Sequence, residues 1–246
     1  LMVSILRVFV DAERLGTSNQ FYEKFSVRAK ILILIDNINK DYGHIFEENI
    51  KAYTEKYQEE SKKMVNSLLN DLIFLNDEVI EKLIAIKNYE DLISDKERYE
   101  KMSEDNKKFE ESKFNENDRI VRAEIRLLNA SFKFLISMCK ILQSFFIKNE
   151  FIKSLANFLD YSLNIFASPL GNDLKLKNLN DYEFNPKFIL GALLSIYGAF
   201  FDSIEFIECV VKDERSYKYS IFEIARNLVK NSENKINNVS DNKNKM

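Results

Sequence analysis

Glycine and proline are scarce in this 246-residue chain, which has five glycines and two prolines. Because these residues interrupt regular structure, their scarcity predicts long helices with few turns. Histidine occurs once, at His44, and the two cysteines, Cys139 and Cys209, are 70 positions apart. A metal site needs ligating side chains clustered at short spacings, so the sequence predicts no metal site. A glycine-rich phosphate loop is also absent, and we expect no cofactor.

Several other absences limit the class of protein. The chain has no apolar run of the roughly 18 residues that a membrane-spanning helix needs, and no signal-peptide layout at its start. Its net charge of −3 provides no basic field for nucleic acid or a membrane surface. Both cysteines lie on apolar helical faces, which is typical of reduced, buried thiols, so we expect a protein of the cytoplasm and nucleus. We also expect a monomer. Residue 1 is Leu, which suggests a piece of a longer polypeptide.

Apolar residues recur at helical spacing along most of the chain. The predicted helices cover residues 21–42, 46–57, 61–86, 121–146, 151–166, 188–211 and 219–229. Residues 89–118 are dominated by charges of both signs and form a solvated helix, a linker or a mobile loop. Residues 231–246 are rich in Asn and Lys and are predicted to be disordered. The pattern predicts an all-α protein, and short turns between paired helices favour an α-solenoid over a four-helix bundle.

Two details of these helices give specific expectations. Residues 188–211 are apolar nearly all round and should form the most buried helix, with Gly191 and Gly198 on one face allowing a neighbour to approach closely. The predicted helix 61–86 is interrupted by two polar pairs, 70–71 and 76–77. Such pairs are more often structural, either hydrogen-bonded between helices or solvated, than catalytic.

Residues 168–187 separate the two helical blocks and contain both prolines. A segment this long without a helix or strand pattern is normally functional or disordered. Its apolar residues argue against disorder, so we expect an ordered strap that lies on the helices. At its end, Asn185 and Pro186 predict the start of the next helix.

The sequence contains no recognisable catalytic constellation. A Cys–His pair would need His44 to meet a cysteine that is predicted to be buried. The turn of residues 213–217 is the best remaining candidate for an interaction surface, because Arg215 can bind a carboxylate and Tyr217 combines an apolar ring with a polar tip. The structural alternative is a helix cap held by Arg215. The candidate interaction residues are Asp213, Arg215, Ser216 and Tyr217, with Asp173 and Lys175 from the strap.

Four stretches occur in the same order as in a known family. They are residues 19–29 (NQFYEKFSVRA), 68–80 (LLNDLIFLNDEVI), 172–188 (NDLKLKNLNDYEFNPKF) and 213–218 (DERSYK). Together they resemble the core of the U-box ubiquitin conjugation (chain-elongation) factors, over about residues 9–230. One difference is that the strap starts with SPLG at residues 168–171, where the family usually has a Gly-Pro-Lys type of start.

The resemblance implies a right-handed α-solenoid of irregular armadillo-like repeats, with residues 1–230 as part of the core. It also implies a ubiquitin-protein ligase that extends chains on ubiquitinated substrates for proteasomal degradation. The implied partners are a ubiquitin-conjugating enzyme, an AAA ATPase segregase and proteasomal shuttle factors. In this family the chemistry belongs to a C-terminal U-box, which we do not find here, so we expect this chain to be an inactive scaffold on its own. The alternative is a helical-repeat adaptor whose partner is unrelated to ubiquitin.

Overall fold

The computed structural model describes residues 2–17, 21–148, 151–168, 174, 176, 177 and 179–230. Throughout these residues the regular elements are helices, without a strand, which confirms the all-α prediction. The chain divides into two compact units. Unit 1 contains residues 1–142 and 174–184, and unit 2 contains residues 143–173 and 185–246. The right-handed solenoid and the single core over residues 1–230 stay predictions, and residues 231–246 lie outside the described part.

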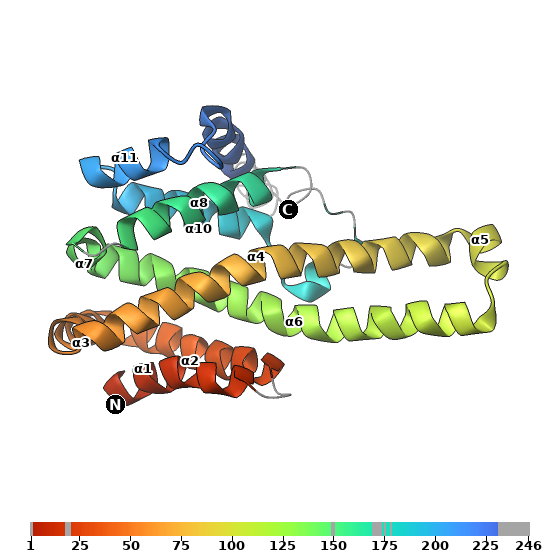
Figure 1. The fold of residues 1–246 in the computed structure, drawn as a ribbon, viewed down its shortest axis with the longest axis horizontal. Coiled ribbons are helices and arrows are strands. Elements are labelled where there is room, and N and C mark those ends of the chain that lie inside the picture. Colours follow the sequence, from red (N-terminus) through yellow and green to blue (C-terminus); the bar gives the residue numbers. More distant parts are fainter. Residues whose placement is uncertain are drawn as a thin grey trace, which may run out of the picture. The chain divides into compact units, whose positions relative to one another are not determined.

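Unit 1 is built on two long helices, α4 and α6, which run antiparallel as a hairpin (Figure 1). At 37 residues and about 1.5 Å per residue, α4 is roughly 55 Å long. α2 packs along α6, while α1 and α3 pack on α4. The elements are α1 (Met2–Asp11), η1 (Ala12–Thr17), α2 (Phe21–Asp41), α3 (Gly43–Lys56), α4 (Gln58–Ser94), α5 (Lys96–Glu100), α6 (Glu104–Ile141) and η2 (Leu179–Tyr182).

The charged region 89–118 is helical, which decides between the three predicted alternatives. α4 continues to Ser94, the short α5 forms the tip of the hairpin, and α6 begins at Glu104. Ser103 caps α6, since its hydroxyl accepts a hydrogen bond from the backbone N–H of Asn106 at 3.3 Å. Few residues here are buried, so the distal hairpin is a solvated pair of helices.

Unit 2 is a smaller set of helices in which α8 packs against α7, α10 and α11. Its elements are α7 (Gln143–Lys148), α8 (Phe151–Ala167), α10 (Pro186–Ala199), α11 (Ile204–Val211) and a helix at residues 219–230. The start of α10 is as predicted, because the Asn185 side chain accepts a hydrogen bond from the backbone N–H of Phe188 at 3.1 Å and Pro186 occupies the first turn.

The prediction of one deeply buried helix over residues 188–211 is wrong. The segment breaks at a turn over residues 200–202, and Ser203 caps a separate helix, α11, by accepting from the N–H of Phe206 at 3.2 Å. Much of α11 is exposed. The expected close approach at Gly191 and Gly198 is also wrong, since no described neighbour lies within 4 Å of a Cβ built at either glycine once the adjacent residues and nearby helix backbone are set aside.

The described part of the strap is ordered, as expected. Leu176, Tyr182 and Phe184 are buried, and residues 174–184 belong to unit 1 although the chain enters and leaves them from unit 2. Residues 169–173, 175 and 178 of the strap lie outside the described part. None of the described helices is both long and apolar enough to cross a membrane.

Candidate functional site

The described residues contain no group of three or more His, Cys, Asp or Glu side chains placed to hold a metal ion. His44 is exposed and lies 3.5 Å from Glu48, within α3. Cys139 is fully buried in α6, and burial raises the pKa of its thiol, which makes the reactive thiolate scarcer. A thiol in this environment is a packing group rather than a nucleophile.

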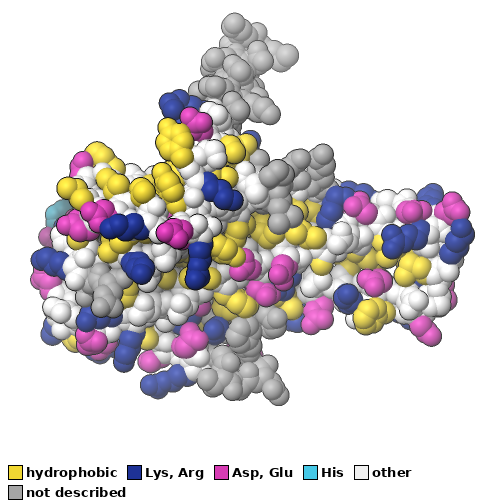
Figure 2. Space-filling model, turned by 45° about the horizontal axis from the view of Figure 1, so that its top comes forward, with side chains coloured by type: hydrophobic (Ala, Val, Ile, Leu, Met, Phe, Trp, Pro, Cys, Tyr) yellow, Lys and Arg dark blue, Asp and Glu magenta, His cyan; other side chains and the backbone are white. Residues whose placement is uncertain are grey.

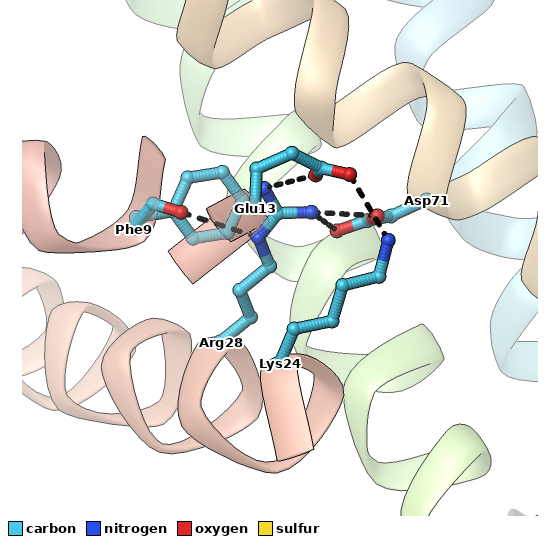
Figure 3. A network of polar contacts seen from close by, with 5 residues as sticks. All are labelled: Phe9, Glu13, Lys24, Arg28 and Asp71. Carbon is cyan, nitrogen blue, oxygen red and sulfur yellow. Dashed lines mark hydrogen bonds and ion pairs between the residues drawn. The ribbon is translucent and has the colours of Figure 1, made fainter. Parts of the chain in front are cut away.

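The most extensive buried polar cluster in unit 1 surrounds Arg28 of α2, which has no exposed side-chain surface (Figure 3). Nη1 of Arg28 lies 2.7 and 2.6 Å from the two carboxylate oxygens of Asp71 in α4. Nη2 donates to Oε2 of Glu13 at 2.7 Å, and Nε donates to the carbonyl oxygen of Phe9 at 3.2 Å. The Lys24 ammonium adds an ion pair with Oε1 of Glu13 at 3.2 Å.

This cluster joins α1, η1, α2 and α4 through one guanidinium. Burial raises the pKa of Asp71, and the charge of Arg28 opposes this effect. Partial burial also acts to raise the pKa of Glu13, but Lys24 and Arg28 together hold it below its usual value. Because a buried ion is costly unless it is paired, Arg28 and Asp71 each require the other.

A cavity of about 550 Å³ adjoins the cluster. Its lining includes Lys24 and Asp71 from the cluster, together with Phe25 and Phe74, whose rings stack with centroids 5.5 Å apart. Sequence reasoning placed Arg28 in the predicted helix 21–42 and Asp71 in a polar pair of the predicted helix 61–86, but it did not join them. The structural interpretation of that polar pair fits Asp71, whose carboxylate binds a neighbouring helix.

The strap is held on the α4–α6 hairpin by a second polar cluster. Arg122 binds the carboxylate of Asp118 through Nε and Nη2, at 3.0 and 2.9 Å, and its guanidinium carbon lies 4.4 Å from the centre of the Tyr182 ring. The Tyr182 hydroxyl donates to Oδ1 of Asp118 at 2.8 Å. The bonds from Arg122 hold the pKa of Asp118 below its usual value, while burial raises that of Tyr182 to about 12.

Other contacts fix the strap at both ends of its described part. The backbone N–H of Lys177 donates to Oε2 of Glu90 at 3.1 Å, and its ammonium donates to the Ser94 hydroxyl at 2.9 Å. Asn129 donates to the carbonyl oxygen of Glu183 at 3.1 Å. Glu183 has a positive φ of 57°, a strained conformation for a residue other than glycine, and this hydrogen bond helps to hold it.

The predicted interaction surface is a turn in unit 2. Oδ1 of Asp213 accepts from the backbone N–H of Arg215 at 3.2 Å, and the carbonyl oxygen of Asp213 accepts from the N–H of Tyr217 at 2.9 Å. The carbonyl oxygen of Ser216 accepts a hydrogen bond from the side chain of Asn164 in α8. Among described residues the Arg215 guanidinium binds nothing and is exposed, so the turn is held by Asp213 rather than by Arg215 as the structural alternative had it.

The interaction surface at this turn stays a prediction, because the contacts of the described residues do not show what the exposed Arg215 would bind. Asp173 and Lys175, the other two predicted residues, lie outside the described part of the chain. The structure therefore brings Asp213, Ser216 and Tyr217 together as a structural turn.

Sequence reasoning missed a buried carboxylate next to this turn. Asp160 of α8 is almost completely buried, and its Oδ1 accepts from the Tyr197 hydroxyl of α10 at 2.5 Å. Its Oδ2 has no hydrogen-bond partner in the described part of the chain. Burial raises the pKa of Asp160 to about 7, and the charge of Asp213 adds to the effect. The available signal was a lone acidic residue in a helix whose apolar residues recur at helical spacing.

Unit 1 has a comparable group in Glu124 of α6, which is fully buried. The ammonium of Lys82 in α4 lies 3.2 Å from Oε1 of Glu124 and also pairs with Glu78. Burial raises the pKa of Glu124 to about 7, although Lys82 opposes the shift. Both carboxylates lie between packed helices, so neither is positioned to meet a substrate.

The comparisons with known proteins agree with the four motifs. The family model described as the ubiquitin elongating factor core matches residues 1–242. The chain belongs to the ubiquitin elongating factor core family.

Relatives of this elongating factor core occur in fungi and plants. The E4 ubiquitin-protein ligase UFD2 of Saccharomyces cerevisiae is 29% identical over 225 residues, which cover 90% of this chain and 23% of the relative. The probable ubiquitin conjugation factor E4 of Arabidopsis thaliana is 28% identical, over 94% of this chain and 22% of the relative. The ubiquitin conjugation factor E4 of Schizosaccharomyces pombe is 29% identical, over 93% of this chain and 22% of the relative. The chain thus spans between a fifth and a quarter of the length of these relatives.

The structure gives the four motifs of the elongating factor core a shared physical role. The first and second motifs meet in the pair of Arg28 and Asp71, the third seats Tyr182 on the hairpin, and the fourth forms the turn that Asn164 of α8 holds. Each motif contributes a polar contact between helices or between a loop and helices. The four motifs therefore contribute polar contacts that help to hold each unit together.

Proposed function

We propose that this chain is a scaffold within a ubiquitin chain-elongation factor, a ubiquitin-protein ligase that extends chains on ubiquitinated substrates for proteasomal degradation. The observation that carries the proposal is the match of the elongating factor core over residues 1–242. The proposal is supported by the contacts of the four motifs, because each of these contacts joins helices to one another or a loop to helices. The proposed role is to set the distance between a bound substrate and the conjugating enzyme.

The proposal assigns the transfer chemistry to a U-box domain of the same protein rather than to these helices. Buried thiol and carboxylate groups, such as Cys139, Asp160 and Glu124, lie in packed interiors. Positioning alone can have a large effect, because a linked reactant has an effective concentration that depends on the geometry of the connection. A helical scaffold restricts that geometry more than a flexible linker does.

The proposed partners are those of the chain-elongation reaction: a ubiquitin-conjugating enzyme, bound through the U-box, and substrates that already carry ubiquitin. An AAA ATPase segregase and proteasomal shuttle factors are proposed as the sources of those substrates. The proposed location is the cytoplasm and nucleus. The names of the relatives, which include a ubiquitin-protein ligase and ubiquitin conjugation factors, support the ubiquitin pathway as a whole.

The decisive experiment is a reconstituted chain-extension assay with a ubiquitin-primed substrate. It compares three proteins: this chain alone, a longer protein that joins it to a U-box, and the same longer protein with residues 2–230 replaced by a Gly/Ser linker. We expect only the second protein to extend chains efficiently, with the linker protein at least about tenfold slower because its effective concentration is lower. The internal control is discharge of the conjugating enzyme's thioester, which the linker protein should perform normally.

Two outcomes would contradict the proposal. Equal extension rates for the linker and helical proteins would show that the helices do not position anything. If the longer protein did not extend chains with any of several conjugating enzymes, the chain would share the family's fold without its function. That result would favour a helical adaptor whose partner is unrelated to ubiquitin.

A further inference from the structure

One surface of unit 2 exposes large apolar side chains that no part of the described chain covers. Phe201 in the turn before α11 is 67% exposed, and Ile204, Ile207 and Val211 along α11 are 70%, 46% and 53% exposed. Yellow hydrophobic side chains are visible over this part of the surface in Figure 2. We call these four residues the α11 stripe. Single exposed apolar residues are ordinary, but a contiguous row of them marks an interaction site.

The stripe is continuous along one side of the helix. Ile204, Ile207 and Val211 are separated by three and four residues, so they lie one above the other on the same face. Another face of α11 holds Phe206 and Val210, which are buried within unit 2. The helix therefore has an inner apolar face that anchors it and an outer apolar face that no described residue covers.

Acidic residues flank the free face. Residues 201–214 include five acidic residues and one basic residue, Lys212. Glu205 and Glu208 are exposed one turn apart beside the stripe, and Asp202 lies in the preceding turn. Lys212 pairs with Glu208 at 2.7 Å, and hydrogen bonds from the helix N-terminus and Ser203 hold the pKa of Glu205 below its usual value. The flank is thus negatively charged at neutral pH.

From this geometry we propose that the α11 stripe docks an amphipathic helix of another protein, which has an apolar face and Lys or Arg along one edge. The apolar face would cover the stripe, and the basic edge would lie against Glu205 and Glu208. Docking of an amphipathic helix through residues spaced by three and four is a recurring mode of recognition. The proposal concerns a surface that none of the four motifs forms, and it does not rest on the proposed function.

Charge argues for this occupant over two others. A symmetric contact between two copies of this chain would place the same acidic flank against itself, and like charges brought together across an interface cost several kcal/mol. A membrane with anionic lipids would likewise repel the flank. A basic helix is the occupant whose charge is complementary to this surface.

The test measures binding of two synthetic helical peptides to the full 246-residue chain by fluorescence anisotropy. The peptides share one apolar face and differ only in the edge, which carries Lys in one and Glu in the other. We expect the Lys peptide to bind at least about tenfold more tightly at low salt, and the difference to shrink as salt is added. Failure of the Lys peptide to bind, or equal binding of both, overturns the proposal.

Substitutions separate the apolar and charged parts of the surface. I204S/I207S should weaken binding of the Lys peptide by at least about tenfold, whereas the matched control I33S/L34S, at two exposed apolar residues of α2, should leave it unchanged. E205Q/E208Q should remove most of the preference for the Lys peptide. All of these positions are exposed, and circular dichroism checks that the variants are folded. Equal losses in the stripe and control variants would overturn the proposal.

The other occupants give distinct results. Dimerisation of the wild-type chain in sedimentation experiments, lost in I204S/I207S, would assign the surface to a second copy. Binding to vesicles of zwitterionic lipid, lost in the same variant, would assign it to a membrane. A gain of tenfold or more in peptide affinity on removing residues 231–246 would assign it to the chain's own terminus. Each of these results would overturn the proposed partner.

Discussion

The two units solve the same problem, a carboxylate buried between helices, in different ways. In unit 1, Asp71 receives a buried counterion, Arg28, which is itself bound by Glu13 and by the carbonyl oxygen of Phe9. In unit 2, Asp160 receives the neutral hydroxyl of Tyr197, and its second oxygen has no partner among the residues described. The first arrangement depends on keeping the charge compensated, and the second favours the protonated acid.

This comparison teaches that burial alone does not decide whether a group is charged. Arg28 binds both oxygens of Asp71 and so favours its ionised form, whereas a phenol can donate only one hydrogen bond and carries no charge. Asp160 accordingly has a pKa near 7, within the physiological range. The stability of the two units should respond differently to mutation and to pH.

The largest expected effect follows from removing the counterion. Arg28→Ala leaves Asp71 buried without its partner, and we expect the free energy of unfolding of unit 1 to fall by about 3–5 kcal/mol. Hydrogen exchange of peptides from α2 and α4 measures this loss, with peptides from α8 as the internal control. The double variant R28M/D71L should regain much of the loss, because neither member of the buried Arg28–Asp71 pair is left without its partner. A single variant as stable as the wild type would contradict the cluster's structural role.

The next effect is a dependence on pH in unit 2. The folded pKa of Asp160, about 7, lies above its ordinary value of 3.8, so the folded state holds the proton more tightly. The contribution of this group is fully present below about pH 4 and is lost as pH rises through about 7. The loss is on the order of 4 kcal/mol at most, because the folded pKa of about 7 lies roughly three units above 3.8 and each unit corresponds to 1.36 kcal/mol.

Asp160→Asn removes this titration. We expect the difference in unfolding free energy between wild type and D160N to change between pH 4 and 8, and to be flat above pH 8. Hydrogen exchange of α8 and α10 measures it at each pH. Glu124→Gln is the matched variant in unit 1. For this variant, the pH-dependent change in unfolding free energy should appear in the hydrogen exchange of α4 and α6 instead. A difference that does not vary with pH would place the folded pKa of Asp160 near its ordinary value.

A smaller effect concerns the strap. Tyr182→Phe removes the hydrogen bond to Asp118 but keeps the buried ring, and we expect the strap to lose about 1 kcal/mol of stability. Faster hydrogen exchange in residues 174–184 would report the loss. Tyr219→Phe is the control, since Tyr219 is exposed and its hydroxyl makes no hydrogen bond within the described part of the chain. Equal exchange in the two variants would show that the hydrogen bond from Tyr182 to Asp118 does not stabilise the strap.

The smallest effect is a gain in stability. Gly191 lies within α10, and a Cβ there would meet no described atom within 4 Å. Gly191→Ala should therefore stabilise unit 2 by about 0.5–1 kcal/mol, because alanine is the better helix former. Thermal unfolding followed by circular dichroism measures the gain. A fall in the melting temperature would instead indicate that a neighbouring helix does approach Gly191 closely, as the sequence had suggested.

Much of the local structure could be predicted from the sequence. The apolar spacing that predicted helices at residues 121–146 and 151–166 is realised by buried faces of α6, α7 and α8, and Asn185 caps α10 as expected. Local signals were sufficient because the caps and periodic faces involve residues only a few positions apart. The break before α11 was missed because residues 200–203 contain neither Gly nor Pro, and only Ser203 marks the new helix.

The polar clusters could not be predicted, because they join distant residues. Arg28 and Asp71 are 43 positions apart, Asp118 and Tyr182 are 64 apart, and Asp160 and Tyr197 are 37 apart. A helical pattern shows which face each residue occupies, but it does not show which residue of another helix lies opposite. For the same reason, the exposed α11 stripe was expected to be buried, since its apolar pattern is the same whether or not a neighbour covers it.

The strap also affects how the molecule can be divided. Residues 174–184 belong to unit 1, but the chain on both sides of them belongs to unit 2. Neither unit is therefore a continuous stretch of polypeptide. A fragment that ends at residue 142 would lack Tyr182, and would leave Asp118 and Arg122 without the contacts that Tyr182 makes. A single proteolytic cut within residues 143–173 would leave unit 1 as two pieces. Truncated or fused versions of the protein should therefore keep residues 1–230 together.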